Sequence, residues 1–186
     1  MLIPDGHGRW KNMASRLGRR VMELLRQGRE EDVAELAISD PRTLSPLMGR
    51  LWDPDARIRR GAAAAMGRSA GACPSLGLEM VRRLMWALND ESATNGVYGI
   101  AALGSIGRRC PDVLAPFIQS LVSMASDDGL RAEILKALAE IAAADRRLVR
   151  DHLARLEAHL DDSREEEVAA FRRLVALAKG EEDEGD

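Results

Sequence analysis

The chain of 186 residues is poor in aromatic side chains, which make up 3% of it, although 46% of its residues are hydrophobic. Its core must therefore consist mainly of Ala, Leu, Met and Val. These side chains suit the close packing of helices, whereas a β-sandwich favours aromatic and β-branched residues. The scarcity of aromatic residues thus predicts a single all-α domain, and the chain is long enough to bury a sizeable core.

The chain also lacks long apolar runs. None approaches the roughly 18 residues that a membrane-spanning helix needs. Residues 1–5 carry neither the basic segment nor the apolar run of a secretory signal peptide. We therefore expect a cytoplasmic protein that does not bind a membrane.

What the chain does contain is an internal repeat. An acidic turn at Asp53-Pro54-Asp55 recurs about every 36 residues, at 89–91, 127–128 and 161–162. Each turn precedes an apolar stretch rich in small residues, which is typical of stacked helical pairs. An acidic side chain at such a turn can cap the second helix of a pair.

Proline supports the same register. Pro41, Pro74 and Pro111 stand where the first helix of a pair would begin, a position that tolerates the missing N–H of proline. Pro46 and Pro116 follow five residues after the first and third of these, inside the same helix, where a proline should bend it. Two proline positions in register indicate homologous units.

The two cysteines, Cys73 and Cys110, each directly precede one of these prolines, so they occupy equivalent positions in successive repeats. Packed helices lie roughly 8–10 Å apart, whereas a disulfide spans at most roughly 7 Å between Cα atoms. Two free thiols are therefore expected, as in proteins of a reducing compartment.

The repeat predicts one domain with three parts. Residues 1–39 form an N-terminal helical cap, with helices at 9–27 and 30–38 separated by Gly28. Residues 180–186 form an acidic tail, whose run of like charges predicts disorder. Between them lie about four helical pairs, at residues 40–72, 73–109, 110–145 and 146–179.

The second helix of each pair contains a small residue in register. Ala65-Met66-Gly67 aligns with Ala102-Leu103-Gly104 and with Ala137-Leu138-Ala139. The small third residue should let neighbouring helices approach closely. In the first pair, helical spacing predicts a buried stripe of Ile58, Ala62, Ala65, Met66 and Ser69.

The stretch from Asp53 to Gly67 resembles the second helix of a HEAT repeat of the short bacterial type, a group that includes the lyase-type repeats. The resemblance covers residues 41–178. The second unit, with Trp86 before residues 89–92, is similar to small single-domain bacterial HEAT proteins. Ala93, Ala101 and Ser105 stand where that group would have a glycine and two acidic residues. The resemblance implies a right-handed α-solenoid (an armadillo-like superhelix) whose second helices line a concave, macromolecule-binding surface.

The opposite stripe of each second helix should face that concave surface. Its predicted partner-binding residues are Arg57, Arg68, Thr94, Tyr98, Ser105, Glu133, Lys136 and Glu140. Along the chain, these residues are basic in the first pair, neutral in the second, which contains the only tyrosine, and of mixed charge with more acidic residues in the third. The whole chain follows this trend, since residues 1–60 contain 12 Arg and Lys against 9 Asp and Glu, and residues 126–186 contain 10 against 17.

Several of these side chains also have a structural interpretation. Tyr98 is either a binding anchor or packs against Trp86 or a neighbouring helix. Trp52 and Trp86 are expected to fill the core or the space between repeats. Arg59 and Arg131 lie two repeats apart and are expected to bond turn carboxylates such as those of Asp53 or Asp127.

No catalytic, cofactor or metal-binding pattern is found. His152 and His159 share a predicted helix face, but no further ligand joins them and a zinc site needs three or four. We therefore expect a non-enzymatic scaffold that binds a protein or peptide and needs no cofactor. The alternatives are nucleic-acid binding through the basic N-terminal third, which the net charge of −3 disfavours, and an enzyme like the HEAT-type DNA glycosylases or bilin lyases.

Overall fold

The computed structural model describes residues 6–89 and 96–180 of the chain. These residues form α-helices, short 3-10 helices (η) and turns, with no strand among them. The prediction of an all-α protein is confirmed. No helix within the described ranges is long and apolar enough to span a bilayer.

The chain begins with two helices, α1 (Gly6–Arg26) and α2 (Glu30–Ser39), close to the predicted ranges. Gly28 separates them with a φ of +67°, a left-handed conformation that glycine adopts without strain. Contacts of α1 with α2, α3 and α4 attach this pair to the rest of the protein.

The remaining helices are described as the first and second helices of successive pairs. In the first pair, the first helix consists of η1 (Pro41–Thr43), α3 (Leu44–Gly49) and η2 (Arg50–Trp52), and in the second pair it is α5 (Pro74–Asn89). In the third pair it consists of η3 (Pro111–Val113), η4 (Ala115–Phe117) and α7 (Ile118–Met124), and in the fourth of α9 (Arg147–Arg150) and α10 (Leu153–Glu157). The second helices are α4 (Ala56–Ala72), α6 (Gly96–Arg109), α8 (Arg131–Ala144) and α11 (Glu165–Lys179).

Proline marks where three of the first helices begin and accompanies the breaks in two of them, whereas the fourth, α9 with α10, is broken without a proline. Pro41, Pro74 and Pro111 are each the first residue of a helical segment, as predicted. Where a second proline follows, at Pro46 or Pro116, the helix is divided into short α and 3-10 segments, because proline offers no N–H to an earlier carbonyl. Helix α5 has no second proline and continues for 16 residues.

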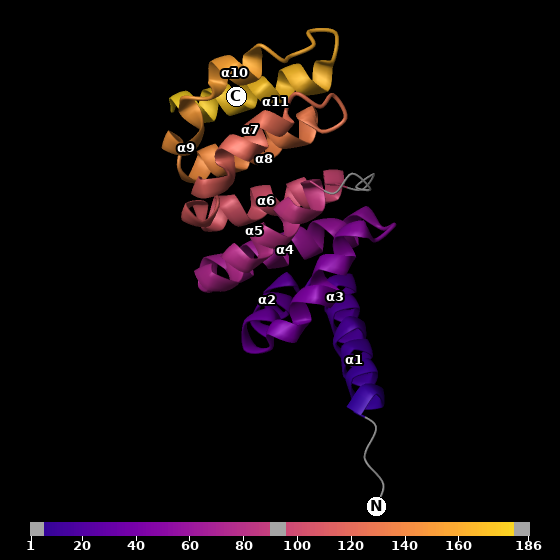
Figure 1. The fold of residues 1–186 in the computed structure, drawn as a ribbon. Helices are drawn as coiled ribbons and strands as arrows, with labels where there is room; N and C mark the ends of the chain where they lie inside the picture. Colours follow the sequence, from indigo (N-terminus) through magenta and orange to yellow (C-terminus); the bar gives the residue numbers. More distant parts are fainter. Residues whose placement is uncertain (1–5, 90–95, 181–186) are drawn as a thin grey trace, which may run out of the picture.

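The second helices pack in chain order: α2 contacts α4, α4 contacts α6, α6 contacts α8, and α8 contacts α11. The result is an elongated molecule with α1 and α11 at opposite ends (Figure 1). Small residues permit the close approach. A Cβ atom on Gly67 would lie 2.5 Å from the carbonyl oxygen of Ser105, and one on Gly104 would lie 2.9 Å from the Cα of Ala137.

Most predictions about the core are confirmed. The stripe from Ile58 to Ser69 is buried at all five predicted positions, Trp52 packs against the core, and both cysteines are free. The prediction for Trp86 is wrong, because 73% of this residue is exposed. Trp86 follows Leu84 and Met85, which fill the core-facing side of α5.

The acidic turn before α4 caps that helix as expected, whereas α8 and α11 have no side-chain cap. The Asp55 carboxylate accepts a hydrogen bond from the Arg57 N–H at the start of α4, and Asp127 accepts one from the Gly129 N–H before α8. The equivalent turn around Asp90 lies outside the described residues. The Asp55 oxygen supplies a partner for an N–H group that the first turn of α4 leaves unpaired, whereas the Asp127 bond stabilises the turn before α8.

Arg59 and Arg131 occupy equivalent positions, and Arg131 pairs with a turn carboxylate as predicted, that of Asp128, whereas Arg59 bonds backbone carbonyls instead. Arg59 Nη1 donates to the carbonyl oxygens of Asp53 and Pro54, at 2.8 and 3.0 Å, and not to the Asp53 carboxylate. Arg131 donates to the carbonyl oxygens of Ala125 and Ser126, which lie the same number of residues before it. The register is correct, and at Arg59 backbone carbonyls take the place of the expected Asp53 carboxylate.

Candidate functional site

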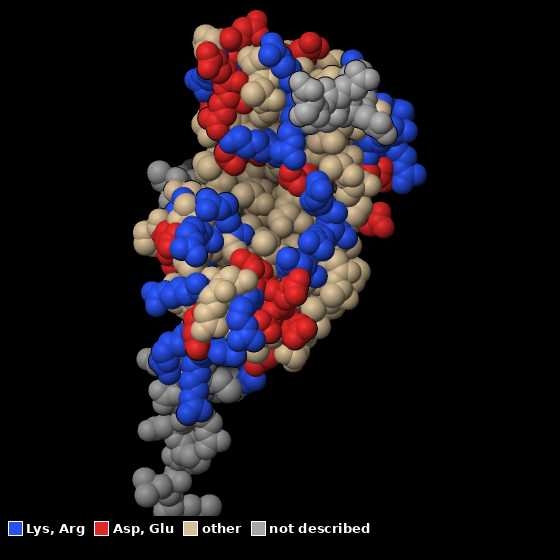
Figure 2. Space-filling view, turned by 180° about the vertical axis from the view of Figure 1, so that it is seen from behind, with Lys and Arg blue, Asp and Glu red and all other residues tan. Residues whose placement is uncertain are grey.

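A groove of about 590 Å³ lies between α4, α6 and α8. We call it the central groove. Its floor is formed by Ala63, Ala64 and Ala101, while charged side chains of α4 and α8 stand on its walls. Figure 2 shows a hollow of uncharged atoms in the middle of the molecule, surrounded by Lys, Arg, Asp and Glu side chains.

The groove exists because α4 and α6 carry small residues on the faces that line it. Alanine side chains leave space at the surface that Leu or Met would fill, whereas the buried faces of the same helices carry Met66 and Leu103, each 0% exposed. Helical spacing separates these two faces. The sequence thus places large side chains in the core and small ones in the groove.

Arg59 and Tyr98 form one end of the groove. The guanidinium carbon of Arg59 lies 4.4 Å from the centroid of the Tyr98 ring, a cation–π arrangement. The two carbonyl bonds of Arg59 hold its guanidinium over the ring. Tyr98 remains 37% exposed, so it offers a fixed aromatic surface at the edge of the groove.

The opposite wall carries Lys136, whose Nζ donates to Glu133 at 2.7 Å and to Glu166 of α11 at 2.6 Å. Partial burial lowers the pKa of the Lys136 ammonium, but the bonds from the two carboxylates outweigh it and raise the pKa above its ordinary value. The Lys136 hydrogen bond lowers the pKa of Glu166 in turn. This wall is a compact network with two negative charges and one positive charge.

The structure brings together four of the residues predicted for partner binding. Tyr98, Ser105, Glu133 and Lys136 all line the central groove. Thr94 lies outside the described residues.

The other three predicted residues do not line the groove. Arg57 is exposed on α4. Arg68 pairs with Glu31 of α2 at 3.0 Å, and Glu140 pairs with Arg108 and Arg173.

The stripe predicted on α4 was displaced around the helix. Gly61, which lies on the same helix face between Arg57 and Arg68, is buried, and a Cβ atom there would lie 3.2 Å from Leu25 of α1 and 3.4 Å from Glu30 of α2. Gly61 and Arg68 therefore face the first two helices, whereas Ala64, between them on the same stripe, lines the groove. Arg59 and Arg60 line the groove in place of Arg57 and Arg68. The equivalent positions of Arg59 and Arg131 in the repeats drew attention to Arg59 in the sequence, whereas no sequence pattern singled out Arg60.

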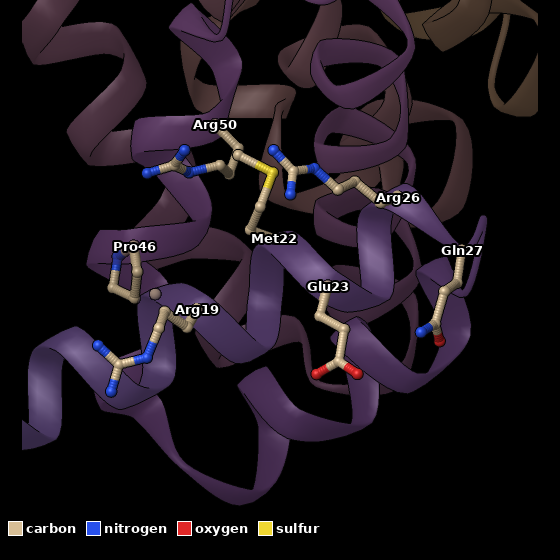
Figure 3. A pocket seen from close by; sticks show the side chains of 8 residues that line it. Arg19, Met22, Glu23, Arg26, Gln27, Pro46 and Arg50 are labelled. Atoms are coloured by element: carbon tan, nitrogen blue, oxygen red, sulfur yellow. The ribbon is translucent and has the colours of Figure 1, made fainter.

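A second hollow lies between α1 and α3, in the basic N-terminal third. Arg19, Arg26 and Arg50 line it together with Glu23. Figure 3 shows the three guanidinium groups separated around Met22. Arg50 is also paired with Asp53 at 3.3 Å. Three separated cations with a carboxylate among them do not form a continuous basic surface.

The histidines do not lie as predicted. His152 precedes the first residue of α10 and His159 follows its end, so they do not share a helix face. Within residues 6–89 and 96–180, no three His, Cys, Asp or Glu side chains are grouped to hold a metal ion.

No protein-family model and no curated protein matches this sequence.

Proposed function

We propose that this protein is a non-enzymatic interaction module that binds a segment of a partner protein in the central groove. The observation that carries the proposal is the groove itself, with its alanine floor and its fixed Arg59–Tyr98 pair. Tyrosine and arginine are enriched among the residues that dominate binding energy. A side chain that is already held in place loses little conformational freedom on binding.

We further propose that the stacked pairs form a right-handed α-solenoid of the HEAT type, with the central groove on its concave side. Support comes from the serial packing of the second helices and from the equivalent bonds of Arg59 and Arg131. In such an architecture each repeat contacts mainly its neighbours, and the curved inner face provides an extended binding surface.

Nucleic-acid binding through the N-terminal third is the less favoured function. Such binding depends on several cations that follow a phosphate backbone. In the N-terminal hollow, Glu23 lies among the arginines and Arg50 is already paired. The central groove also carries Glu133, which would repel phosphate.

The proposed function can be tested by filling the groove. Ala101 is an exposed alanine of α6 on the groove floor, so Ala101→Trp should block the groove without disturbing the core. Ala154→Trp introduces the same side chain at an exposed alanine of α10 outside the groove and serves as the matched control. Far-UV circular dichroism would verify that both variants are folded.

The ligands for this test are peptides selected from a random displayed library against the wild-type protein. We expect Ala101→Trp to abolish binding of the selected peptides and Ala154→Trp to leave it unchanged. Peptides that bind equally to all three proteins would show that the central groove is not the binding site.

A further inference from the structure

The central groove is electrostatically asymmetric, with the two arginines Arg59 and Arg60 on its α4 wall and the Glu133–Lys136–Glu166 network on its α8 side. We infer that the segment bound there is an acidic peptide, and that a carboxylate of this peptide pairs with Arg60. This inference rests on the proposed function, because it names the chemistry of the partner at the same site.

Arg60 is the groove cation that is available to a partner. It is exposed and makes no ion pair with any residue that the structure describes. Lys136, in contrast, already donates to two carboxylates. Arg59 is stacked on Tyr98 and bonded to two carbonyl oxygens, so the position of its guanidinium is fixed. Because these partners carry no negative charge, they do not neutralise the positive charge of Arg59.

The neighbouring charges determine which end of the groove attracts an acid. Arg59 and Arg60 are adjacent, and neither is paired with a carboxylate among the described residues. On the opposite side the two carboxylates of Glu133 and Glu166 exceed the one ammonium group of Lys136. A peptide should therefore bind with its acidic residue over α4, because the α8 side repels it.

The floor defines the rest of the ligand. Ala63, Ala64 and Ala101 present methyl groups only, so the residues beside the acid should be apolar and small enough to approach them. The volume of about 590 Å³ falls within the roughly 300–1,000 Å³ of ligand sites. The groove thus suits a short segment and not the face of a folded domain.

Burial is what would make this charge pair contribute to affinity. An exposed ion pair contributes little, because water screens it and both side chains lose freedom. A peptide lying on the alanine floor would exclude water from Arg60 and from the carboxylate between them. Removal of one member of a desolvated, hydrogen-bonded charge pair has a large effect on dissociation.

The test uses three displayed peptide pools of equal length in an alanine-rich background. One pool carries Asp and Glu, one carries Lys and Arg, and one carries uncharged residues only. Each pool is bound to the wild type, Arg60→Glu, Arg82→Glu and Ala101→Trp. Arg82 is an exposed arginine of α5 outside the groove, so Arg82→Glu is the matched control for the change of charge. A fluorescent oligothymidylate is measured in parallel.

We expect the wild type to prefer the acidic pool. Arg60→Glu should weaken its binding by about thirtyfold or more, whereas Arg82→Glu should leave it unchanged. A preference for the basic or uncharged pool, or equal binding of the acidic pool by Arg60→Glu, would overturn the inference. If Ala101→Trp still abolished that binding, the groove would stand as a peptide site and only its charge preference would be wrong.

Two other outcomes would reject the inference and the proposed function together. The first is that no pool binds, or that Ala101→Trp binds every pool as the wild type does. The second is that oligothymidylate alone binds and is lost in Ala101→Trp, which would make the groove a nucleic-acid site.

Discussion

Arg131 of α8 and Glu167 of α11 form an ion pair of 3.1 Å in the interior of the protein, with side chains only 6% and 3% exposed. Both partners have further bonds. Arg131 donates to two backbone carbonyls and pairs with Asp128, and Glu167 accepts from Arg164 at 3.0 Å. The C-terminal helix is thus attached to the preceding pair through a buried network and not through apolar contacts alone.

Removing one member of this pair should destabilise the protein. Glu167→Ala removes one acceptor of the buried Arg131 guanidinium, which keeps its pair with Asp128, and such a loss typically costs about 1–3 kcal/mol. Glu79→Ala is the matched control, because the Glu79–Arg83 pair is about half exposed on one helix and should contribute under about 0.5 kcal/mol. Urea unfolding measures both changes, and equal losses would contradict this account of the network.

The contact between α4 and α6 should not tolerate an added methyl group. Gly67→Ala would place Cβ 2.5 Å from the backbone oxygen of Ser105, so the helices must move apart at a cost of about 1–3 kcal/mol. Gly49 has no atom within 4 Å of an added Cβ and a negative φ. Gly49→Ala should therefore be neutral or stabilising by up to about 1 kcal/mol. Thermal unfolding that ranked the two variants in the opposite order would refute the close contact.

The bond between Lys136 and Glu166 should make stability depend on pH on the acid side. Its hydrogen bond lowers the pKa of Glu166 below the ordinary value of 4.5. A carboxyl group with a lowered pKa stabilises the folded state above its unfolded pKa, and this contribution is lost as the pH falls through the folded value. We expect Glu166→Gln to be less stable than wild type at pH 7.

The same difference should shrink as the pH is lowered below 4.5. Glu165→Gln, which changes a neighbouring exposed carboxylate of the same helix, is the control and should show less of this dependence. Urea midpoints measured across the pH range provide the comparison. A difference that stayed constant from neutral to acid pH would contradict the proposed origin of the effect.

Cys73 should react faster than an ordinary thiol. The Ser75 hydroxyl, 3.4 Å from its sulfur, and the backbone N–H groups at the start of α5 lower the pKa of Cys73. A lower pKa gives more thiolate near neutral pH, and the thiolate is the reactive form. We expect iodoacetamide to label Cys73 faster at pH 7 in the wild type than in Ser75→Ala, with Cys110 unchanged. Mass spectrometry of timed samples would show this, and identical Cys73 rates in both proteins would exclude the hydroxyl as the cause.

The sequence was most informative where one residue acts through local chemistry. Proline lacks an N–H, so Pro41, Pro74 and Pro111 predicted the starts of helical segments correctly. Gly67 predicted a close helix contact, because only a small residue allows one. These effects depend on few neighbours and can therefore be recognised without coordinates.

The candidate site was predicted less well, because it depends on how each helix is rotated about its axis. Tyr98 and Lys136, both predicted to share one surface, line the groove, whereas Arg60 lies there and Arg57 does not. A small rotation of α4, determined by the burial of Gly61 against the first two helices, separates those alternatives. Trp86 was misplaced for a similar reason, since α5 fills its core side with other apolar residues and leaves the indole exposed.

The central claim, that a peptide binds in the groove between α4, α6 and α8, can be tested most directly at Tyr98. It is the only tyrosine of the chain, so protein labelled with fluorotyrosine gives one fluorine resonance. We predict that titration with a selected peptide shifts this resonance in the wild type and in Ala154→Trp, and that the shift is absent in Ala101→Trp. A peptide whose binding is evident by calorimetry but leaves the Tyr98 resonance unchanged would contradict the claim.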